Sequence, residues 1–258
     1  MYFAFLGTSG AVPSASRDTT ALVVVASEGA MMIDCGGSPL ARLRRAGVDP
    51  FVLSHVFITH VHPDHAYGLP ALVQNLRLLG RERELTVFCR PEHVGTIRQL
   101  LTVFQLWERP GFPLRLAETG AAPAAGVLEL GPLLVSTAPV EHGNMPNYAV
   151  RVDVVGQLER GVVYSSDTAP CEAVATLARG AHTLIHEATF PHRDRGRFGV
   201  HSTAYEAGQV AARAGVRRLL LTHIEADYHD EADSLAGEAR KSFGGPVEIA
   251  REFAPYDF

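Results

Sequence analysis

The chain has 258 residues, enough for one large domain or two small ones, and it can bury a substantial core without disulfides. Hydrophobic residues make up 47% and charged residues 20%, and no apolar run approaches the roughly 20 residues that a membrane span needs. The net charge of -5 argues against a generally basic nucleic-acid binder, although it leaves room for a local basic patch. We therefore expect one soluble domain over residues 1–258.

Strand-like and helix-like segments alternate along the chain. Runs rich in β-forming residues predict about ten strands, at residues 2–7, 20–27, 30–36, 52–60, 85–90, 133–140, 147–155, 161–167, 183–190 and 217–224. Amphipathic segments with helical spacing predict helices at 39–46, 69–79, 92–104, 171–178, 203–214 and 231–242. The segment GAAPAAG, residues 120–126, is typical of a loop. Strands followed by helices, twice over, predict an α/β fold of sheets covered by helices.

The first residues and the cysteines indicate the compartment. The start, MYFAFLGTSG, lacks the basic region and apolar stretch of a secretion signal, so we expect a cytoplasmic protein with no membrane partner. Cys35, Cys89 and Cys171 form no CxxC pair, which argues against a disulfide framework or a thiolate zinc site. We expect all three in the core.

Polar residues stand where several predicted strands end. His60, His142, Asp167, His186 and His223 each lie at or just past the C-terminal end of such a strand. Side chains gathered at these ends face one common rim. The pattern therefore predicts a site that is assembled from distant parts of the chain.

The segment HVHPDH is the densest group of metal-ligand residues. Its members His60, His62, Asp64 and His65 place three imidazoles and a carboxylate within six residues. His60 and His62 can point the same way on an extended turn, and both ligand types suit borderline divalent ions. A solvated turn or a set of buried core histidines is the alternative, and it leaves this density unexplained.

A single zinc ion takes about four ligands, so the cluster needs help from elsewhere. His142, Asp167 and His223 are the candidates, although a surface histidine or a capping aspartate could explain each one taken alone. Together with the cluster they make five histidines and two carboxylates, enough for two metal ions with a shared carboxylate. Two ions about 3.5 to 4 Å apart make hydroxide available near neutral pH, which suits phosphodiester cleavage. The set predicts a dinuclear hydrolase.

The motifs resemble a known family. THVHPDH is similar to the HxHxDH signature of the metallo-β-lactamase superfamily, which implies a four-layer αββα sandwich. FLGTSGAVPSASR, SDTAPC, HEATF and HST occur in that order and resemble the RNase Z group of tRNA 3′-processing endonucleases. The resemblance covers nearly the whole chain and also implies a homodimer, although no sequence feature identifies an interface.

The resemblance implies a role for each ligand. One zinc ion would take His60, His62 and His142. A second would take Asp64, His65 and His223, and Asp167 would bridge the two ions. Asp34 in MMIDCGG resembles the family's structural aspartate, which braces the site. These ligands also accept manganese or iron, so the identity of the metal stays open.

Glu187 of HEATF and His201 of HST are implied to lie beside the metals. Our hypothesis is that Asp64 takes up the proton of the attacking hydroxide, while His201, held by Glu187, protonates the leaving oxygen. The alternative is that Glu187 and His201 are ordinary surface or helix-capping residues. We assign no role to His182 or His186.

The sequence departs from the RNase Z pattern where that family grips RNA. Only 24 residues separate His142 from Asp167, where processing enzymes carry a long flexible arm. Ala15 and Asp18 replace the lysine and asparagine of the PxKxRN pattern, and Asp227 stands where many relatives carry arginine. Each change removes or reverses a charge that could contact a phosphate chain.

We therefore expect an armless phosphodiesterase that acts on a small or cyclic phosphodiester. The alternative is tRNA 3′ processing, with the precursor gripped by a partner subunit or by the arginine loop 193–199, which could instead be merely solvated. Thioester or lactam hydrolysis needs the same metals but explains neither Glu187 nor His201. A binding module that has lost turnover predicts gaps among the ligands, and the sequence contains none.

Overall fold

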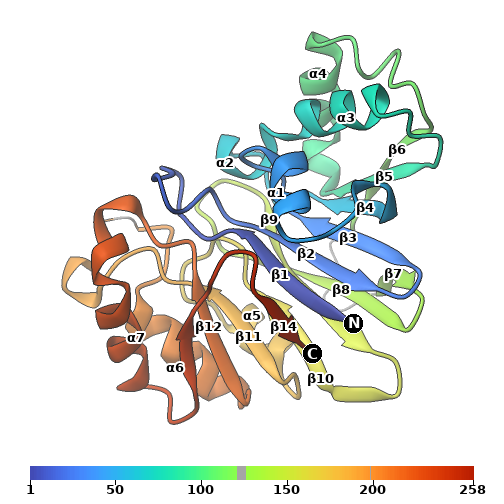
Figure 1. Ribbon diagram of the computed structural model, residues 1–258. Coiled ribbons are helices and arrows are strands. Elements are labelled where there is room, and N and C mark those ends of the chain that lie inside the picture. The colour runs from blue at the N-terminus through green and yellow to red at the C-terminus, as the bar shows by residue number, and fades with distance from the viewer. Residues whose placement is uncertain (121–125, 198) are drawn as a thin grey trace.

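The computed structural model describes residues 1–120, 126–197 and 199–258, and within them it forms two seven-stranded sheets. Across the first sheet the strands are β14 (Pro255–Asp257), β1 (Tyr2–Gly7), β2 (Ala21–Ala26), β3 (Gly29–Ile33), β4 (Leu53–Phe57), β5 (Leu85–Cys89) and β6 (Leu114–Glu118). Figure 1 shows the two termini side by side, because β1 and β14 pair antiparallel with Tyr2 opposite Asp257.

The second sheet repeats the plan of the first. Its strands are, in order, β13 (Val247–Ile249), β12 (Arg218–Thr222), β11 (Thr183–Glu187), β10 (Gln157–Tyr164), β9 (Asn147–Val154), β8 (Leu133–Val140) and β7 (Gly126–Leu130). In each sheet an antiparallel meander, β1–β2–β3 or β8–β9–β10, is followed by three parallel strands. The predicted succession of strands and then helices, twice over, is confirmed.

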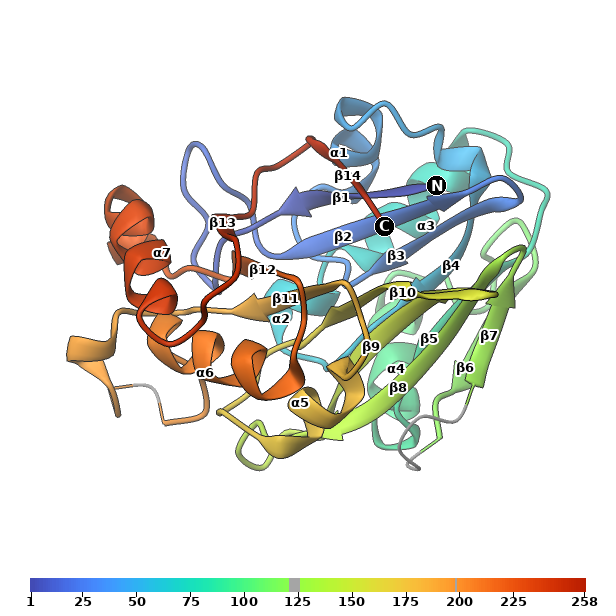
Figure 2. The same ribbon diagram turned by 90° about the horizontal axis from the view of Figure 1, so that it is seen from below.

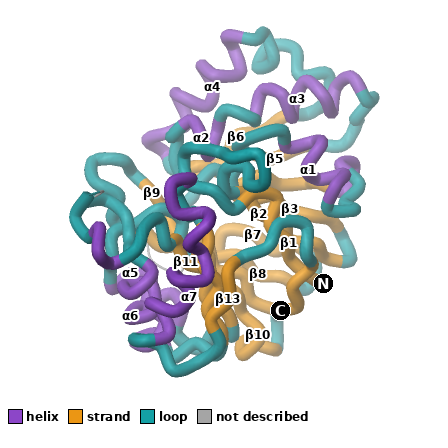
Figure 3. Tube along the Cα trace, turned by 60° about the vertical axis from the view of Figure 1, so that its left-hand side comes forward, coloured by secondary structure: helices purple, strands orange, loops and turns teal. Residues whose placement is uncertain are grey.

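The helices cover the outer faces of the two sheets. They are α1 (Pro39–Arg45), α2 (Pro63–Ala66), α3 (Leu69–Leu78), α4 (Val94–Val103), α5 (Glu172–Ala178), α6 (Ala204–Ala214) and α7 (Ala232–Arg240). Helices α1, α3 and α4 pack on the first sheet, and α5 to α7 pack on the second (Figures 1 and 2). Figure 3 shows the strands between two groups of helices. This arrangement is the four-layer αββα sandwich that the sequence implied.

Three apolar layers hold the sandwich together. The central one lies between the sheets and includes Phe57 stacked on Phe88 with 4.6 Å between ring centroids. The outer two lie under the helices, with Leu72 of α3 in one and Val174 of α5 in the other. Both sheets are therefore buried on two faces, which is why inner strands such as β5 and β12 are almost continuously apolar. The three cysteines are free and buried in the core, as predicted.

The ten predicted strands are present, with ends shifted by a few residues. The structure adds four that the sequence did not predict, 114–118, 126–130, 247–249 and 255–257, and these are the edge strands of the two sheets. An edge strand pairs on one side only, so it needs no continuous apolar pattern. Most of the predicted loop 120–126 lies outside the described residues.

The segment between His142 and Asp167 forms a tight hairpin. Strands β9 and β10 fill it, and only Val155 and Gly156 connect them. Gly156 has φ +77, which a glycine adopts without strain. No long arm leaves the fold at this point.

Candidate metal centre and active site

Loops from both sheets meet at one rim of the sandwich. They carry His60, His62, Asp64 and His65 after β4, His142 after β8, Asp167 after β10 and His223 after β12. The loop after β4 leaves the first sheet, and the loops after β8, β10 and β12 leave the second sheet. The structure therefore brings together all seven of the ligands expected from the sequence.

Three residues at this rim have a strained backbone conformation. Asp34, Ser166 and His223 are not glycines, yet they have φ values of +63, +54 and +56. Such left-handed conformations are costly for residues with a Cβ atom and tend to occur at functional sites. His223 leaves β12 through this conformation, which marks the end of the strand.

Three imidazoles converge on one side of the rim. The Nε2 atom of His60 lies 3.0 Å from Nδ1 of His62, and the Nε2 atom of His142 lies 3.2 Å from that same Nδ1. Three nitrogens pointing at one place could hold a metal ion, because each offers a ligand atom within 4.8 Å of the others. Nδ1 of His142 lies 3.2 Å from the Val200 carbonyl oxygen, which orients its ring.

A second group lies beside the first. The Oδ2 atom of Asp167 is 3.2 Å from Nε2 of His65, 3.1 Å from Nε2 of His223 and 3.9 Å from Nε2 of His60. The Oδ2 atom of Asp64 is 3.1 Å from Nε2 of His65. Asp167 therefore stands between the two groups, where a carboxylate shared by two ions would stand.

Asp34 braces the second group from behind. Its carboxylate lies 2.8 Å from Nδ1 of His65, and it accepts hydrogen bonds from the Thr59 backbone N–H at 2.9 Å and the Tyr164 hydroxyl at 3.3 Å. An acceptor at Nδ1 fixes the tautomer so that Nε2 faces the site. The bracing role implied by the MMIDCGG motif agrees with this geometry.

The donor set fits divalent metal ions. Asp167 Oδ1 is buried without a hydrogen-bond partner among the described residues, and the buried Nε2 atoms of His65 and His223 lie near carboxylate oxygens without forming a well-oriented hydrogen bond. Buried polar atoms are nearly always paired, so a cation shared by these atoms accounts for them. Burial holds the pKa of His60 well below its usual value, so its imidazole is neutral, the form that binds metal.

Glu187 and His201 form a buried ion pair next to this cluster. The Oε1 atom of Glu187 lies 2.9 Å from Nδ1 of His201 and accepts the Thr168 backbone N–H at 2.8 Å. Oε2 accepts the Thr189 hydroxyl at 2.6 Å and the Ser202 N–H at 3.0 Å. Burial acts to lower the pKa of His201, but the Glu187 carboxylate raises it, and the net shift is upward.

The HST motif owes its position to a helix cap. Thr203 begins α6 with a capping box, in which its hydroxyl accepts the Glu206 N–H and the Glu206 carboxylate accepts the Thr203 N–H. This cap fixes the turn that carries His201. The imidazole of His201 stacks on His223 with 5.4 Å between centroids and lines a pocket of about 360 Å³ together with His62, Asp64 and Asp167.

Sequence reasoning missed several supporting residues. Thr189 lies 3.0 Å from Nδ1 of His223, which orients that ring, and it sits inside the HEATF motif. Asn147 donates to the Asp167 carbonyl at 2.7 Å and accepts from the Ser166 hydroxyl at 3.1 Å. Motif similarity could have identified Thr189, whereas no sequence signal marks Asn147.

His186 lies in β11 rather than past its end. Its Nδ1 atom donates to the carbonyl of Glu187 at 2.8 Å, and the side chain is fully buried. Successive side chains of a strand point to opposite faces, so His186 and Glu187 face opposite ways. Among the described residues, the metal-ligand groups do not include His186.

Carboxylates pair with the arginines of the loop 193–197. Arg193 pairs with Glu231 at 2.8 Å, and Arg195 pairs with Glu206 at 2.8 Å. Arg197 donates to the Tyr228 hydroxyl at 2.7 Å and lies 3.6 Å from Asp227. Position 198 of the loop lies outside the described residues. The loop is charge-balanced as it stands, so it does not present unpaired guanidinium groups.

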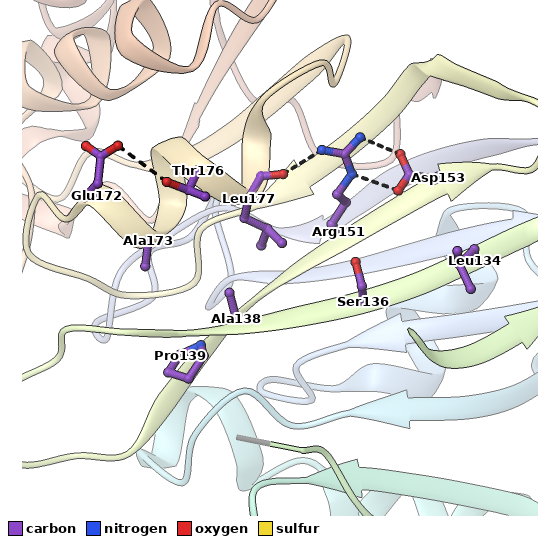
Figure 4. A pocket seen from close by; sticks show the side chains of 10 residues that line it. All are labelled: Leu134, Ser136, Ala138, Pro139, Arg151, Asp153, Glu172, Ala173, Thr176 and Leu177. Carbon is purple, nitrogen blue, oxygen red and sulfur yellow. Dashed lines mark hydrogen bonds and ion pairs between the residues drawn. The ribbon is translucent and has the colours of Figure 1, made fainter. Parts of the chain in front are cut away.

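A roomier pocket of about 460 Å³ lies away from this rim (Figure 4). Strands β8 and β9 and helix α5 line it. Arg151 there is held by Asp153 at 2.7 Å and by the Leu177 carbonyl at 2.6 Å. Its lining residues include no histidine or cysteine, and its arginine is paired. We therefore place the chemistry in the smaller pocket, where the ligands converge.

Fold and site together define a metal-dependent hydrolase of the metallo-β-lactamase fold. A family model described as beta-lactamase superfamily domain matches residues 30–224, a span that includes all seven candidate ligands. Ribonuclease Z of Haloarcula marismortui is 33% identical, with 98% of this chain and 95% of the relative covered. Ribonuclease Z of Methanosarcina mazei is 31% identical, with 93% and 92% covered. The chain belongs to the ribonuclease Z family.

The alignment with the H. marismortui enzyme runs over 298 positions, 40 more than the 258 residues of this chain. That relative therefore carries residues for which this chain has no counterpart. Among solved structures, the fold resembles the metallo-β-lactamase fold protein YhfI of Bacillus subtilis, with TM-score 0.84, 24% identity and coverage of 100% and 99%. It also resembles human tRNase Z, short form, with TM-score 0.81, 21% identity and the same coverage. Among the described helices, none has the length and apolar character to span a bilayer.

Proposed function

We propose that this chain is a dinuclear zinc phosphodiesterase that acts on a small or cyclic phosphodiester. Three imidazoles would hold one ion, two imidazoles and a carboxylate would hold the other, and one carboxylate would be shared. These ligands are His60, His62 and His142 for the first ion, Asp64, His65 and His223 for the second, and Asp167 for both. The convergence of these seven side chains, beside a pocket that His201 lines with four of them, carries the proposal.

When bound, the two ions would activate water near neutral pH and neutralise charge on the phosphate. Asp64 would accept the proton of the attacking water. Burial acts to raise the pKa of Asp64, but His65 and His223 lower it well below its usual range. The carboxylate is therefore ionised and has a free lone pair for the proton, although the lowered pKa makes it a weaker base.

His201 would donate a proton to the leaving oxygen. Its Nδ1 atom is engaged by Glu187, which leaves Nε2 to exchange a proton with the substrate. Glu187 itself is fully buried and accepts four hydrogen bonds, so it orients His201 without contacting the substrate. In such a pair the imidazole transfers the proton, and the carboxylate orients the imidazole.

Three features favour a small substrate. The hairpin β9–β10 leaves no arm to hold a tRNA body. Carboxylates pair with the arginines of the loop 193–197. The pocket is about 360 Å³, a volume typical of small-molecule sites.

The alternative is tRNA 3′ processing, which the similarity to ribonuclease Z enzymes favours. This function requires a partner subunit, or a rearranged arginine loop, to bind the body of the tRNA. In either case we treat residues 1–258 as one domain, because both sheets supply ligands to one site. A homodimer and a cytoplasmic location stay predictions.

The test compares two substrates for the metal-loaded protein, a precursor tRNA with a 3′ extension and bis(p-nitrophenyl) phosphate. Asp64→Ala is the blank. We expect hydrolysis of the small diester and an intact tRNA. Cleavage at the end of the acceptor stem would favour the alternative, and no turnover of either substrate would contradict both. Elemental analysis should find two zinc ions per chain, and fewer than one after reconstitution would contradict the site.

A further inference from the structure

The outer wall of the active-site pocket is acidic. Glu225, Ala226 and Asp227 form this wall, and Ala11 and Val12 of the N-terminal loop lie with them in the lining. Asp64 and Asp167, deeper in the same pocket, are candidate metal ligands whose charge bound ions would neutralise. Glu225 and Asp227 belong to no group of candidate ligands among the described residues. Their charges therefore remain when metal is bound.

Glu225 is held in place. Its backbone N–H donates to the Thr189 carbonyl at 3.0 Å, so it is tied to the residue that orients His223. Its side chain packs on Gly10, where an added Cβ atom would lie 2.5 Å from Oε2. Within the described chain, the partly buried carboxylate forms no hydrogen bond or ion pair that would offset its charge.

The cations near this wall are committed to other partners. Arg197 lies between Asp227 and the Tyr228 hydroxyl. Arg17 donates to the Thr8 hydroxyl at 3.1 Å and Arg42 pairs with Glu252, so neither contacts Glu225. The residues that line the pocket include neither lysine nor arginine.

We propose that Glu225 and Asp227 form an acidic filter that sets the charge of the substrate. A diester with one negative charge meets this wall with that single charge, which the metal centre would neutralise. A nucleotide chain carries further phosphates beside the scissile one. These would have to lie near Glu225, whose carboxylate has no partner, and near Asp227, whose charge the exposed pair with Arg197 offsets only in part. Like charges at a pocket mouth lower both the association rate and the affinity of such a ligand. The inference rests on the proposed phosphodiesterase activity and identifies residues that select its substrate.

The test removes the charges and keeps the shape. The rim variant is Glu225→Gln/Asp227→Asn. The matched control is Glu129→Gln/Glu159→Gln, which removes the same net charge from exposed positions on β7 and β10, outside the pocket lining. The first measurement is kcat/KM for a six-nucleotide single-stranded RNA, divided by kcat/KM for bis(p-nitrophenyl) phosphate. The second is the affinity for the same RNA, measured by fluorescence anisotropy.

At low ionic strength we expect the rim variant to raise the RNA-to-diester ratio and the RNA affinity about tenfold or more, with the gain shrinking as salt screens the charges. The control variant should stay within about twofold of the wild type. An unchanged rim variant, or an equal gain in the control, would overturn the filter. If the wild type hydrolyses neither substrate, the proposed activity fails, and the anisotropy measurement still decides the filter.

Discussion

The imidazole of His201 and the carboxylate of Glu187 meet at 2.9 Å in a pair whose carboxylate has no exposed surface. They lie fourteen positions apart in the chain, and the turn between β11 and α6 brings them together. Hydrogen bonds satisfy both oxygens of the carboxylate, so its position is fixed and it orients the imidazole beside the candidate metal centre.

We expect His201→Ala to lower kcat for an unactivated dialkyl phosphate about 10²- to 10⁴-fold, because general-acid catalysis supplies that much. The same variant should change hydrolysis of bis(p-nitrophenyl) phosphate far less, since p-nitrophenolate leaves without a proton. Steady-state kinetics on both substrates check this. His182→Ala removes a histidine outside the pocket lining and serves as the control. Equal losses on the two substrates would argue against an acid role.

Glu187→Gln tests positioning without loss of volume. The amide can still accept a hydrogen bond from His201, but it no longer supplies the charge that stabilises the imidazolium. Because burial alone lowers the pKa of His201, we expect that pKa to fall in the variant. Metal content should stay at the wild-type value while kcat falls. Loss of the metal would instead show that Glu187 supports the ligands.

Asp34→Asn should weaken metal binding about 10- to 100-fold, the usual cost of losing a partner that orients a ligand. Asparagine tolerates the left-handed backbone that Asp34 adopts, so the fold should survive. Competition with a chelator measures the affinity. Asp153→Asn, a buried carboxylate paired with Arg151 away from the site, is the matched control. Unchanged metal affinity in Asp34→Asn would remove the bracing role.

Metal should stabilise the folded chain, because the ligands come from both sheets and converge only on folding. Free zinc at about 100 times Kd should add about 2.7 kcal/mol per occupied site to the free energy of unfolding. Denaturant titration with and without zinc measures this difference. A His62→Ala/His223→Ala variant should lose most of the gain, and an undiminished gain would place the binding elsewhere.

Phe57→Ala should cost about 3–5 kcal/mol of stability, the usual range for a buried aromatic. Phe57 has no exposed surface and stacks on Phe88 between the sheets. Denaturant unfolding checks the value. Phe104→Ala, at an exposed position just after α4, should stay within about 0.5 kcal/mol of the wild type. A small loss for Phe57→Ala would mean that the central layer repacks.

The sequence by itself determined the ten inner strands and the seven candidate ligands, and its resemblance to the metallo-β-lactamase superfamily implied the four-layer order. Strand and helix patterns depend on periodicities within one segment, and HVHPDH concentrates four ligands in one turn, so local information was enough. Single ligands such as His142 and His223 could be assigned because each ends an apolar strand.

Only the tertiary structure decided the rest. The edge strands β6, β7, β13 and β14 each pair with one neighbour only, and for β6, β13 and β14 that neighbour is distant in the chain, so no local pattern encodes the pairing. His186 lies at a strand end like the ligands, but the alternation of faces in β11 turns it away from the site, while Glu187 faces His201. The neutralised arginine loop and the unpaired Glu225 likewise follow from contacts between segments far apart in the chain, because a side chain's charge partners are set by the packing of those segments.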